Sequence, residues 1–450
     1  MRRAFIACAE ILAILWGIAA AAVAAPELAA IVSQTIREGL LFAPIRVAEL
    51  VSDPEYAFED LNWTFTGQVD LRVLPYLDRL MIVVPDQEWT GAETIRFEVC
   101  NPAGECAARE AAFTVCEVND VPVLSRIPHR IVRSGERFGP VSLGGLATDV
   151  DHGNSDLEWS VEGHRDLTAS VVDGRLVISA PSDGWIGAET LQVRVCDPAG
   201  GCAEQEVVFA RIDEAAIVLT LVQNAGFAIE AGGRKILIDA LLTQSVSAES
   251  QEAMRTAEPP FDADLILITH RHSDHFSATI VADNLRTNRE AIVVSTPDVV
   301  DRIVQAYPEV DANRLIGIDL GEKESTVVEA DGLSIRVHEF PHGPPNLGFL
   351  FTLGEWTVFH PGDVTDTLAR EWFLHYGLAD IGIDIALVPW FLMTMPEYQG
   401  ALIDGLRAGK YVPMHITGGF DRTCEGASAA FGNTLCFAGP MDVWIGFAAD

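Results

Sequence analysis

Lysine is almost absent from this chain. Only three lysines occur among 450 residues, and lysine and arginine together number 30 against 65 aspartates and glutamates, so the formal net charge is −35. Binding to nucleic acid requires a concentrated basic surface, which this composition does not supply. The sequence therefore excludes a nucleic-acid-binding protein, and its acidity indicates solubility, a saline habitat or cation binding.

Long apolar segments are also missing once the first 25 residues are passed. Residues 1–24 begin with a short basic start, continue into the apolar run ILAILWGIAAAAVAA and reach the small residues Ala22 and Ala24, which is the layout of a secretory signal peptide. The apolar run is shorter than the ~20 residues needed to span a bilayer, and an uncleaved anchor is the alternative. We expect a periplasmic or secreted protein with no membrane span after signal cleavage.

Cysteine is rare outside close pairs. Cys8 falls in the signal peptide, and six of the other seven cysteines are near a partner: Cys100 with Cys106, Cys196 with Cys202, and Cys424 with Cys436. An oxidising compartment closes such pairs as disulfides. A catalytic thiol is the alternative for the last pair. Cys116 is left over, and we expect it to be a buried thiol or to compete with the first pair.

An internal repeat fills the first half of the chain. Shifting the chain by 96 residues aligns residues 26–113 with the following segment without a gap, so that DLNWTFTG meets DLEWSVEG and CNPAGEC meets CDPAGGC. Each copy alternates apolar and polar residues in short runs separated by turn residues, which is typical of antiparallel β-sandwiches. We therefore expect two immunoglobulin- or cadherin-like sandwiches, at 25–120 and 121–213.

The joint between the copies, EVNDVP at 117–122, resembles the linker of cadherin-like and bacterial immunoglobulin-like tandem domains. The resemblance implies calcium between the copies, a cation that takes hard oxygen ligands. The implied ligands are Glu117, Asn119, Asp120, Asp149 and Asp151. An ordinary acidic turn is the alternative. Such repeats also suggest attachment to a surface or self-association.

Residues 214–450 differ from the repeats in their expected secondary structure, because helix-like stretches such as 298–306 now separate the strands. This alternation indicates an α/β or α+β catalytic domain. The apolar run 265–269 leads directly into a dense polar cluster consisting of His270, His272, Asp274 and His275. Imidazole and carboxylate are suitable ligands for zinc, manganese or iron. Three later residues each follow an apolar run, so we expect all four segments to deliver their ligands to the same end of a sheet: the cluster at 270–275, His342, Asp363 and His415.

This pattern resembles the metallo-β-lactamase superfamily, whose HxHxDH signature and later His, Asp and His match the chain in order. The segments VLTLVQNAGFAIE, KILID, GDV, LVPW and PMHI are most similar to its lactonase-like branch. The resemblance implies an αββα sandwich over 214–450, so the whole chain would be two all-β sandwiches followed by an α+β domain. It also implies that Asp239 lies behind the metal ligands, and we interpret His360 as a supporting residue of the same kind.

The site implied by this resemblance holds two divalent ions, with zinc expected and manganese or iron as alternatives. One ion is expected on His270, His272 and His342, and the other on Asp274, His275 and His415. Asp363 is expected to bridge them, and Asp274 and Asp363 are the expected catalytic carboxylates. Two ions about 3.5 to 4 Å apart lower the pKa of a bound water, so a metal-bound hydroxide would be the nucleophile.

We expect an exported hydrolase that cleaves a lactone or another small ester. A phosphodiesterase or phospholipase-type hydrolase is the second interpretation, and a non-enzymatic adhesion or scaffold protein with a hydrolase fold is the third. The segment WFLMTM at 390–395 would line an apolar acyl pocket or belong to the core. Four cations near the ligands in sequence would serve an anionic substrate or lie at the surface: Arg271, Arg407, Lys410 and Arg422.

Overall fold

The computed structural model describes residues 23–364, 367–416 and 419–448. The chain forms two compact units, one made of the residues up to Leu124 with 147–158 and 195–203, and the other of 125–146, 159–194 and 204 onwards. No helix in the described ranges is long and apolar enough to cross a membrane. The expected signal peptide at 1–24 lies, apart from its last two residues, outside the described ranges.

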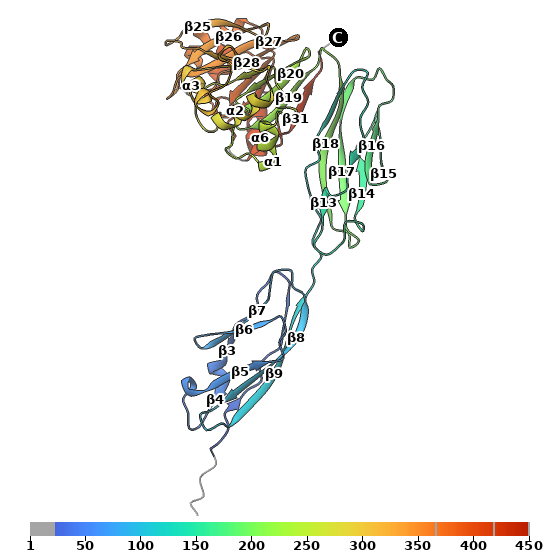
Figure 1. Cartoon of the computed structure of the whole chain (residues 1–450), viewed down its shortest axis with the longest axis vertical. Coiled ribbons are helices and arrows are strands. Elements are labelled where there is room, and N and C mark those ends of the chain that lie inside the picture. Colours follow the sequence, from blue (N-terminus) through green and yellow to red (C-terminus); the bar gives the residue numbers. More distant parts are fainter. Residues whose placement is uncertain (1–22, 365–366, 417–418, 449–450) are drawn as a thin grey trace, which may run out of the picture. The chain divides into compact units, whose positions relative to one another are not determined.

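Short strands build the first copy of the repeat (Figure 1). They form a four-stranded sheet in the order β2-β9-β8-β5, a three-stranded sheet β3-β7-β6 and the pair β1-β4. Ile95, Phe97 and Phe113 are among the fully buried side chains of its core. The bounds are β1 Glu27–Leu28, β2 Gln34–Arg37, β3 Ile45–Arg46, η1 Val47–Glu49, β4 Val51–Ser52, η2 Phe58–Asp60, β5 Asn62–Thr66, β6 Arg72–Tyr76, β7 Arg79–Val83, β8 Gly91–Cys100 and β9 Cys106–Cys116.

The second copy repeats this arrangement strand for strand. Its sheets run β11-β18-β17-β14, β12-β16-β15 and β10-β13, and β11 pairs in parallel with β18 as β2 does with β9. The bounds are β10 Val123–Leu124, β11 Arg130–Arg133, β12 Val141–Ser142, β13 Ala147–Thr148, β14 Glu158–Glu162, β15 Thr168–Val172, β16 Arg175–Ser179, β17 Gly187–Cys196 and β18 Cys202–Ile212. The long strands β8 and β17 are offset by 96 residues, so the predicted repeat is confirmed.

Two mixed sheets form the body of the C-terminal domain. One runs β24-β23-β22-β21-β20-β19-β31 and the other β25-β26-β27-β28-β29-β30. In the first sheet β21 to β24 are parallel, and in the second β28 to β30 are parallel. The bounds are β19 Ile217–Gln223, β20 Gly226–Ala231, β21 Arg234–Ile238, β22 Leu265–Leu267, β23 Ile292–Ser295, β24 Leu315–Gly317, β25 Ser325–Ala330, β26 Leu333–Phe340, β27 Asn346–Leu353, β28 Trp356–His360, β29 Ile385–Pro389, β30 Lys410–Met414 and β31 Val443–Gly446.

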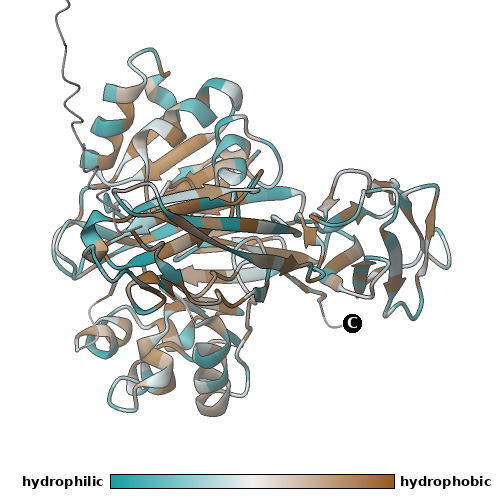
Figure 2. Cartoon of the chain, turned by 90° about the horizontal axis from the view of Figure 1, so that it is seen from below, coloured by the Kyte–Doolittle hydropathy of each residue, from teal (hydrophilic) through white to brown (hydrophobic). Residues whose placement is uncertain are grey.

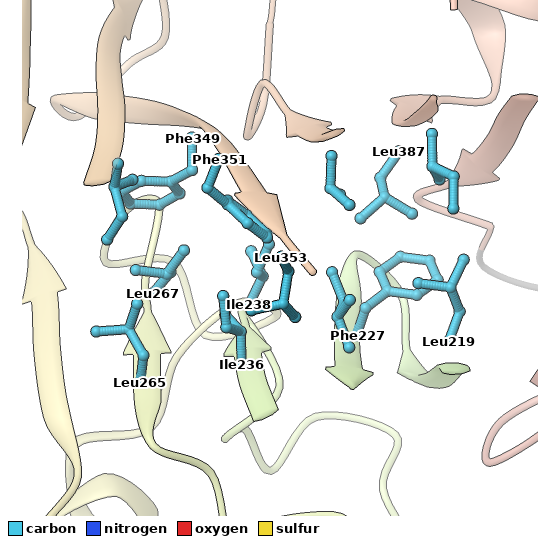
Figure 3. Close-up of a cluster of buried hydrophobic side chains, with 14 of the residues drawn as sticks. Leu219, Phe227, Ile236, Ile238, Leu265, Leu267, Phe349, Phe351, Leu353 and Leu387 are labelled. Carbon is cyan, nitrogen blue, oxygen red and sulfur yellow. The ribbon is translucent and has the colours of Figure 1, made fainter. Parts of the chain in front are cut away.

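The two sheets pack face to face through a shared apolar core. Phe227 and Leu267 of the first sheet lie in one cluster with Phe349 and Leu387 of the second (Figure 3). Helices cover the outer face of each sheet, with α1 to α3 on the first and α4, η5, α5 and α6 on the second. Figure 2 shows helices on both sides of the strand layers. The predicted αββα sandwich is confirmed, and both faces of these strands are apolar because both are covered.

The helices around this sandwich are short. Their bounds are α1 Ala248–Arg255, α2 Ala278–Thr287, α3 Pro297–Ala306, η3 Ala312–Arg314, α4 Ala369–His375, η4 Leu378–Asp380, α5 Phe391–Thr394, the π-helix η5 Ala401–Leu406 and α6 Phe420–Ala430. The predicted helix at 298–306 corresponds to α3, which starts at Pro297, a residue suited to the first helical turn because it needs no N–H partner there.

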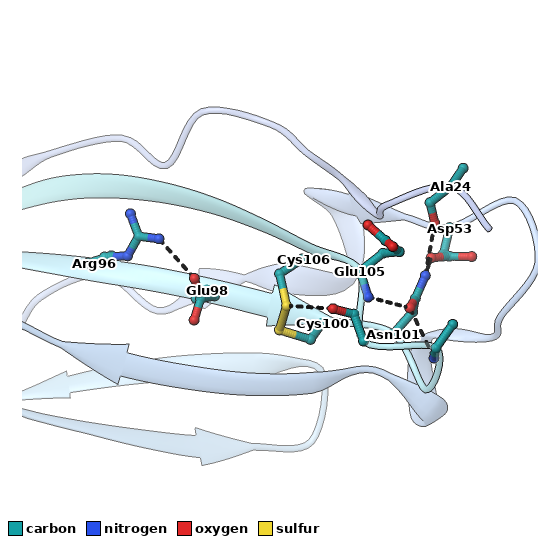
Figure 4. Close-up of a disulfide and its surroundings, with 10 residues drawn as sticks. Ala24, Asp53, Arg96, Glu98, Cys100, Asn101, Glu105 and Cys106 are labelled. Atoms are coloured by element: carbon teal, nitrogen blue, oxygen red, sulfur yellow. Dashed lines mark hydrogen bonds and ion pairs between the residues drawn. A yellow bond between two sulfur atoms is a disulfide. The ribbon is translucent and has the colours of Figure 1, made fainter. Parts of the chain in front are cut away.

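Disulfides join the expected cysteine pairs within the described residues: Cys100 with Cys106, Cys196 with Cys202, and Cys424 with Cys436. The first closes the base of the hairpin between β8 and β9 (Figure 4). Cys116 is exposed, so the expectation of a buried thiol is wrong. Burial alternates along the end of β9, where Val115 faces the core and Cys116 faces outward.

Candidate metal centre

The predicted metal ligands lie where strands of both sheets end. Four of them, between His270 and His275, follow β22 of the first sheet, whereas His342, Asp363 and His415 follow β26, β28 and β30 of the second. The prediction that all the ligands follow strands of one sheet is therefore wrong. A buried strand of either sheet is a continuous apolar run, so the pattern alone does not assign a strand to its sheet.

The ligating atoms of these seven residues form two groups. One group consists of His270, His272, His342 and Asp363, and the other of Asp274, His275 and His415. Within each group, one ligand atom from every residue lies within 4.8 Å of those of the others. The division matches the two predicted ligand sets, and Asp363 belongs to the group of the first.

Asp363 lies between the two groups. Its Oδ2 is 3.8 Å from Nε2 of His270 and 3.6 Å from Nε2 of His342. Its Oδ1 is 3.3 Å from Nε2 of His275 and 2.5 Å from Nε2 of His415. Each carboxylate oxygen therefore faces one group.

Ring nitrogens converge in both groups. Nδ1 of His272 lies 3.0 Å from Nε2 of His270 and 3.2 Å from Nε2 of His342, and Nε2 of His275 lies 2.9 Å from Nε2 of His415. Oδ1 of Asp363 is buried and makes no well-formed hydrogen bond within the described residues. Imidazole nitrogens and carboxylate oxygens gathered in this way are a suitable donor set for one cation per group.

Asp239 holds one histidine of each group in the required tautomer. The Nδ1–H of His275 donates to Oδ2 of Asp239 over 2.7 Å, which leaves Nε2 free. The Thr269 hydroxyl also donates to Asp239, over 2.7 Å, and its oxygen lies 2.9 Å from Nδ1 of His270. Because that hydroxyl proton is already used, Nδ1 of His270 must be the donor. Carboxylates behind histidine ligands fix ring orientation and raise ligand basicity.

The charges of the site shift its pKa values strongly. Burial lowers the pKa of His270 to about 3, with a further contribution from His275. Burial also disfavours the charged form of His275, but Asp239 and Asp363 outweigh it and raise the pKa to about 10. Burial raises the pKa of Asp363, yet the imidazoles of His275 and His415 beside its Oδ1 hold it well below its usual range. The carboxylate is thus ionised at neutral pH, as a metal ligand must be.

The loop that carries Asp363 is clamped from two sides. Asn346 is fully buried; its amide donates to the Asp363 carbonyl over 3.0 Å and accepts from the Asp363 N–H over 3.1 Å. Gly362 has φ +65°, and a Cβ there would lie 2.2 Å from Oδ1 of Asn346. His360 is buried, donates to the Ala225 carbonyl and accepts from the Gly362 N–H. Both ring nitrogens of His360 are therefore occupied by the backbone, and neither is available as a ligand.

A cavity of about 340 Å³ opens beside the ligands. It is lined by His342, Asp363, Val364, Pro389, Trp390, Phe391 and His415. Trp390 and Phe391 thus belong to the cavity wall, whereas Leu392 and Met393 are buried in the core. Among the described residues that line it there is no lysine or arginine. Arg271, the nearest of the four cations in sequence, instead pairs with Asp298 at 3.3 Å.

A second group of acidic side chains lies at the joint of the repeats. Oδ1 of Asp149 accepts from the backbone N–H groups of Asp151 and His152, at 3.0 and 2.8 Å, and Asp151 accepts from the Asp120 N–H at 2.8 Å. The side chain of Asp149 is 0% exposed, and its Oδ2 has no hydrogen-bond partner among the described residues. Asn119 donates to Asp197 over 2.9 Å. The Glu117 side chain makes no hydrogen bond or ion pair in the described part of the chain.

Sequence reasoning missed four residues that support these sites. Thr269 and Asn346 are ordinary polar residues at strand ends, and nothing in their spacing marks them. Glu88 is exposed, and partial desolvation together with the nearby charges of Asp120, Glu38 and Asp151 raises its pKa, which places it near the joint. Asp197 was detectable, because the repeat aligns it with Asn101.

Two families match parts of this chain: a β-lactamase superfamily domain at 218–415 and a bacterial Ig domain at 119–210. A UPF0173 metal-dependent hydrolase from Pyrobaculum arsenaticum is 31% identical over 198 residues, which cover 43% of this chain and 80% of that protein. Another UPF0173 metal-dependent hydrolase, from Pyrococcus horikoshii, is 32% identical over 204 residues, which cover 43% of this chain and 81% of that protein. The structure of Igni18, a metallo hydrolase from Ignicoccus hospitalis, superposes with a TM-score of 0.39 at 19% identity, covering 52% of this chain and all of that one. On the family match and the two sequence relatives, the chain belongs to the β-lactamase superfamily of metal-dependent hydrolases.

Proposed function

We propose that this protein is an exported hydrolase with two divalent ions, zinc in the first instance, that cleaves a neutral small ester such as a lactone. The observation that carries the proposal is the position of Asp363, whose two carboxylate oxygens each face one ligand group. A bridging carboxylate requires this arrangement. Divalent ions bound there would polarise the ester carbonyl and lower the pKa of a water, so no side-chain nucleophile is needed.

The chain's own residues orient this chemistry. Asp239 and Thr269 hold Nδ1 of His275 and His270 and so direct Nε2 of both rings at the site. Asn346 fixes the backbone on either side of the Asp363 carboxylate. A purely adhesive role has no support here, because ligating side chains fill all seven positions.

The cavity favours a neutral substrate over a phosphodiester. Val364, Pro389, Trp390 and Phe391 give it an apolar wall, and apolar lining with few polar groups is typical of small-molecule sites. A phosphodiester would place a negative charge beside Asp363, and the described lining residues include no lysine or arginine to balance it. This contrast favours lactones and other uncharged esters over the phosphodiesterase interpretation.

Metal content and a substrate panel test the proposal together. We expect two zinc ions per chain and turnover of lactones or aryl esters, with little turnover of a phosphodiester such as bis(4-nitrophenyl) phosphate. Asp274→Ala should lower both the metal content and the activity, whereas the half-exposed Asp404→Ala serves as a matched control. Activity that survives Asp274→Ala unchanged would exclude the two-ion mechanism, and turnover of the phosphodiester alone would favour the second interpretation.

Export is supported by the bonded cysteine pairs, because disulfides persist in oxidising compartments. The intact mass of the mature protein recovered from the periplasm or the medium tests this proposal. We expect a chain that lacks residues 1–24 and carries three closed disulfides. A full-length chain with reduced thiols, recovered from the cytosol, would contradict it.

We also propose a calcium site at the joint of the repeats, and the two copies themselves provide the supporting comparison. In the first copy Asn101 donates to Oδ2 of Asp53 over 3.1 Å, so this half-buried carboxylate is satisfied (Figure 4). The repeat aligns Asp53 with Asp149 and Asn101 with Asp197. A carboxylate at 197 has no proton to donate, and Oδ2 of Asp149 is left buried and unpaired. A cation with oxygen ligands would satisfy Oδ2 of Asp149.

Calcium titration of the zinc-saturated full chain tests this site, with Asp197→Asn as the decisive variant. We expect calcium to raise the melting temperature of the wild type. The variant restores the arrangement of the first copy, so it should lose the calcium response and be at least as stable as the wild type without calcium. A wild type that does not respond, or a variant that responds fully, would refute the site.

A further inference from the structure

The tight turn between β19 and β20 lies over the second ligand group. Gln223 pairs with Gly226, so the turn consists of Asn224 and Ala225 alone. Asn224 has φ +52°, a left-handed conformation that asparagine and glycine adopt more readily than other residues. The side chain of this residue is therefore held in one direction by a rigid two-residue turn.

Asn224 contacts two of the three residues of the second group. Its Nδ2 donates to Oδ2 of Asp274 over 3.0 Å and lies 3.4 Å from the Asp274 carbonyl oxygen. Its own backbone carbonyl accepts from the N–H of His415 over 3.1 Å. The remaining member, His275, is held separately by Asp239. The whole group is thus oriented by the turn on one side and by Asp239 on the other.

The fold itself gains little from the Asn224 amide. Asn224 is 8% exposed, and its Oδ1 is buried without a hydrogen-bond partner among the described residues. Burial of an unpaired amide oxygen opposes folding. The hydrogen bonds that the side chain does make go to a metal-ligand residue, Asp274, which indicates a role in the site.

We infer that Asn224 is a positioning residue for the second ion, an inference that rests on the proposed two-ion site. A neutral N–H fixes the rotamer of Asp274 without neutralising its charge, whereas a lysine or arginine in this place would compete with the ion for the carboxylate. The backbone carbonyl of Asn224 fixes the start of the loop after β30, because it accepts from the N–H of His415. His415 itself has φ +65°. Asn224 thereby sets the affinity of one ion and leaves the other group unaffected.

Zinc binding to the full chain, measured by competition with a chromophoric chelator, tests the inference. Asn224→Gly preserves the turn conformation and the carbonyl bond to His415 but removes the amide, and Asn224→Asp replaces the donor with a repelling carboxylate. We expect two binding steps in the wild type and a loss of about 10- to 100-fold in one step only for either variant. Asp173→Gly is the matched control, because Asp173 has φ +49°, lies in the two-residue turn between β15 and β16 and is remote from the ligands in sequence.

A double-mutant cycle with Asp274→Ala separates positioning from a general loss of stability. If Asn224 acts through Asp274, the double variant should bind zinc no more weakly than Asp274→Ala alone; an additional loss would overturn the inference. A wild type that binds one zinc ion would refute the proposed two-ion function and the inference with it. A wild type that binds two, with both affinities unchanged in a folded Asn224 variant, would refute only the role of Asn224.

Discussion

Replacing His338 with leucine should stabilise the hydrolase domain, and increasingly so as the pH falls. His338 lies on β26, is 1% exposed and packs 4.3 Å from the ring of Tyr376. Neither ring nitrogen has a hydrogen-bond partner among the described residues. A buried imidazole without a partner has nothing to stabilise its protonated form.

The magnitude follows from the pKa of His338. Burial, with smaller contributions from the charges of Arg336 and His375, lowers it from 6.5 to about 4. The unfolded chain therefore takes up a proton near pH 6.5 that the folded chain refuses until about pH 4. Above pH 6.5 titration of His338 leaves stability unchanged. Below it stability falls, and the gap between the two pKa values corresponds to about 3 kcal/mol once both are passed, at 1.36 kcal/mol per pH unit.

Urea unfolding of the chelator-treated full chain between pH 7 and pH 4 measures this effect. Treatment with a chelator removes the separate acid sensitivity of metal binding. The free energy of His338→Leu minus that of the wild type should grow by about 3 kcal/mol over this range. His338→Gln is the control, because it removes the titration while keeping a polar side chain. Its free energy of unfolding minus that of the wild type should change with pH in the same way, from a lower value at pH 7. A difference that stays constant with pH for both variants would refute the reasoning.

Three further outcomes are expected at the metal centre. Asp239→Asn should weaken zinc binding about 10- to 100-fold, because the carboxylate that holds Nδ1–H of His275 is lost; unchanged affinity in a chelator competition would contradict this. Metal-free His275, whose pKa is raised to about 10, carries a proton at pH 7 that zinc must displace. Calorimetry in buffers of different ionisation enthalpy should therefore detect proton release when zinc binds. The affinity for zinc should also fall as the pH is lowered. Trp390→Ala should raise KM for apolar esters with little change in zinc content, because Trp390 lines the cavity beside the ligands. An equal loss of activity toward small and bulky esters would argue against a contact between Trp390 and the substrate.

The fold was predictable because its signals are local. Alternation along segments such as 94–99 needs only neighbouring residues to indicate a strand, and the 96-residue repeat doubles the evidence for each sandwich. The same alternation would have placed Cys116 outward, since Val115 beside it faces the core. The prediction of a buried thiol at Cys116 was wrong because it considered only whether this cysteine has a disulfide partner and not its place in the alternating pattern.

The candidate metal ligands could be picked out in the sequence because they are chemically unusual residues at strand ends. What could not be found is how they are held. Asn224 and Thr269 act through hydrogen bonds to residues 50 and 30 positions away, and such distances become contacts only when the strands of the first sheet pair. The assignment of ligands to two sheets has the same cause, since strand pairing is a long-range property of the fold.

The delivery of ligands from both sheets has a mechanical consequence. His272 and His342 are 70 residues apart along the chain, and His275 and His415 are 140 apart, yet each pair meets across the gap between the sheets. An ion shared by either pair would fasten one sheet to the other at the edge that carries the ligands, in the manner of a cross-link that closes a long loop. The supply of metal would then govern how long the enzyme survives proteases as well as how fast it works.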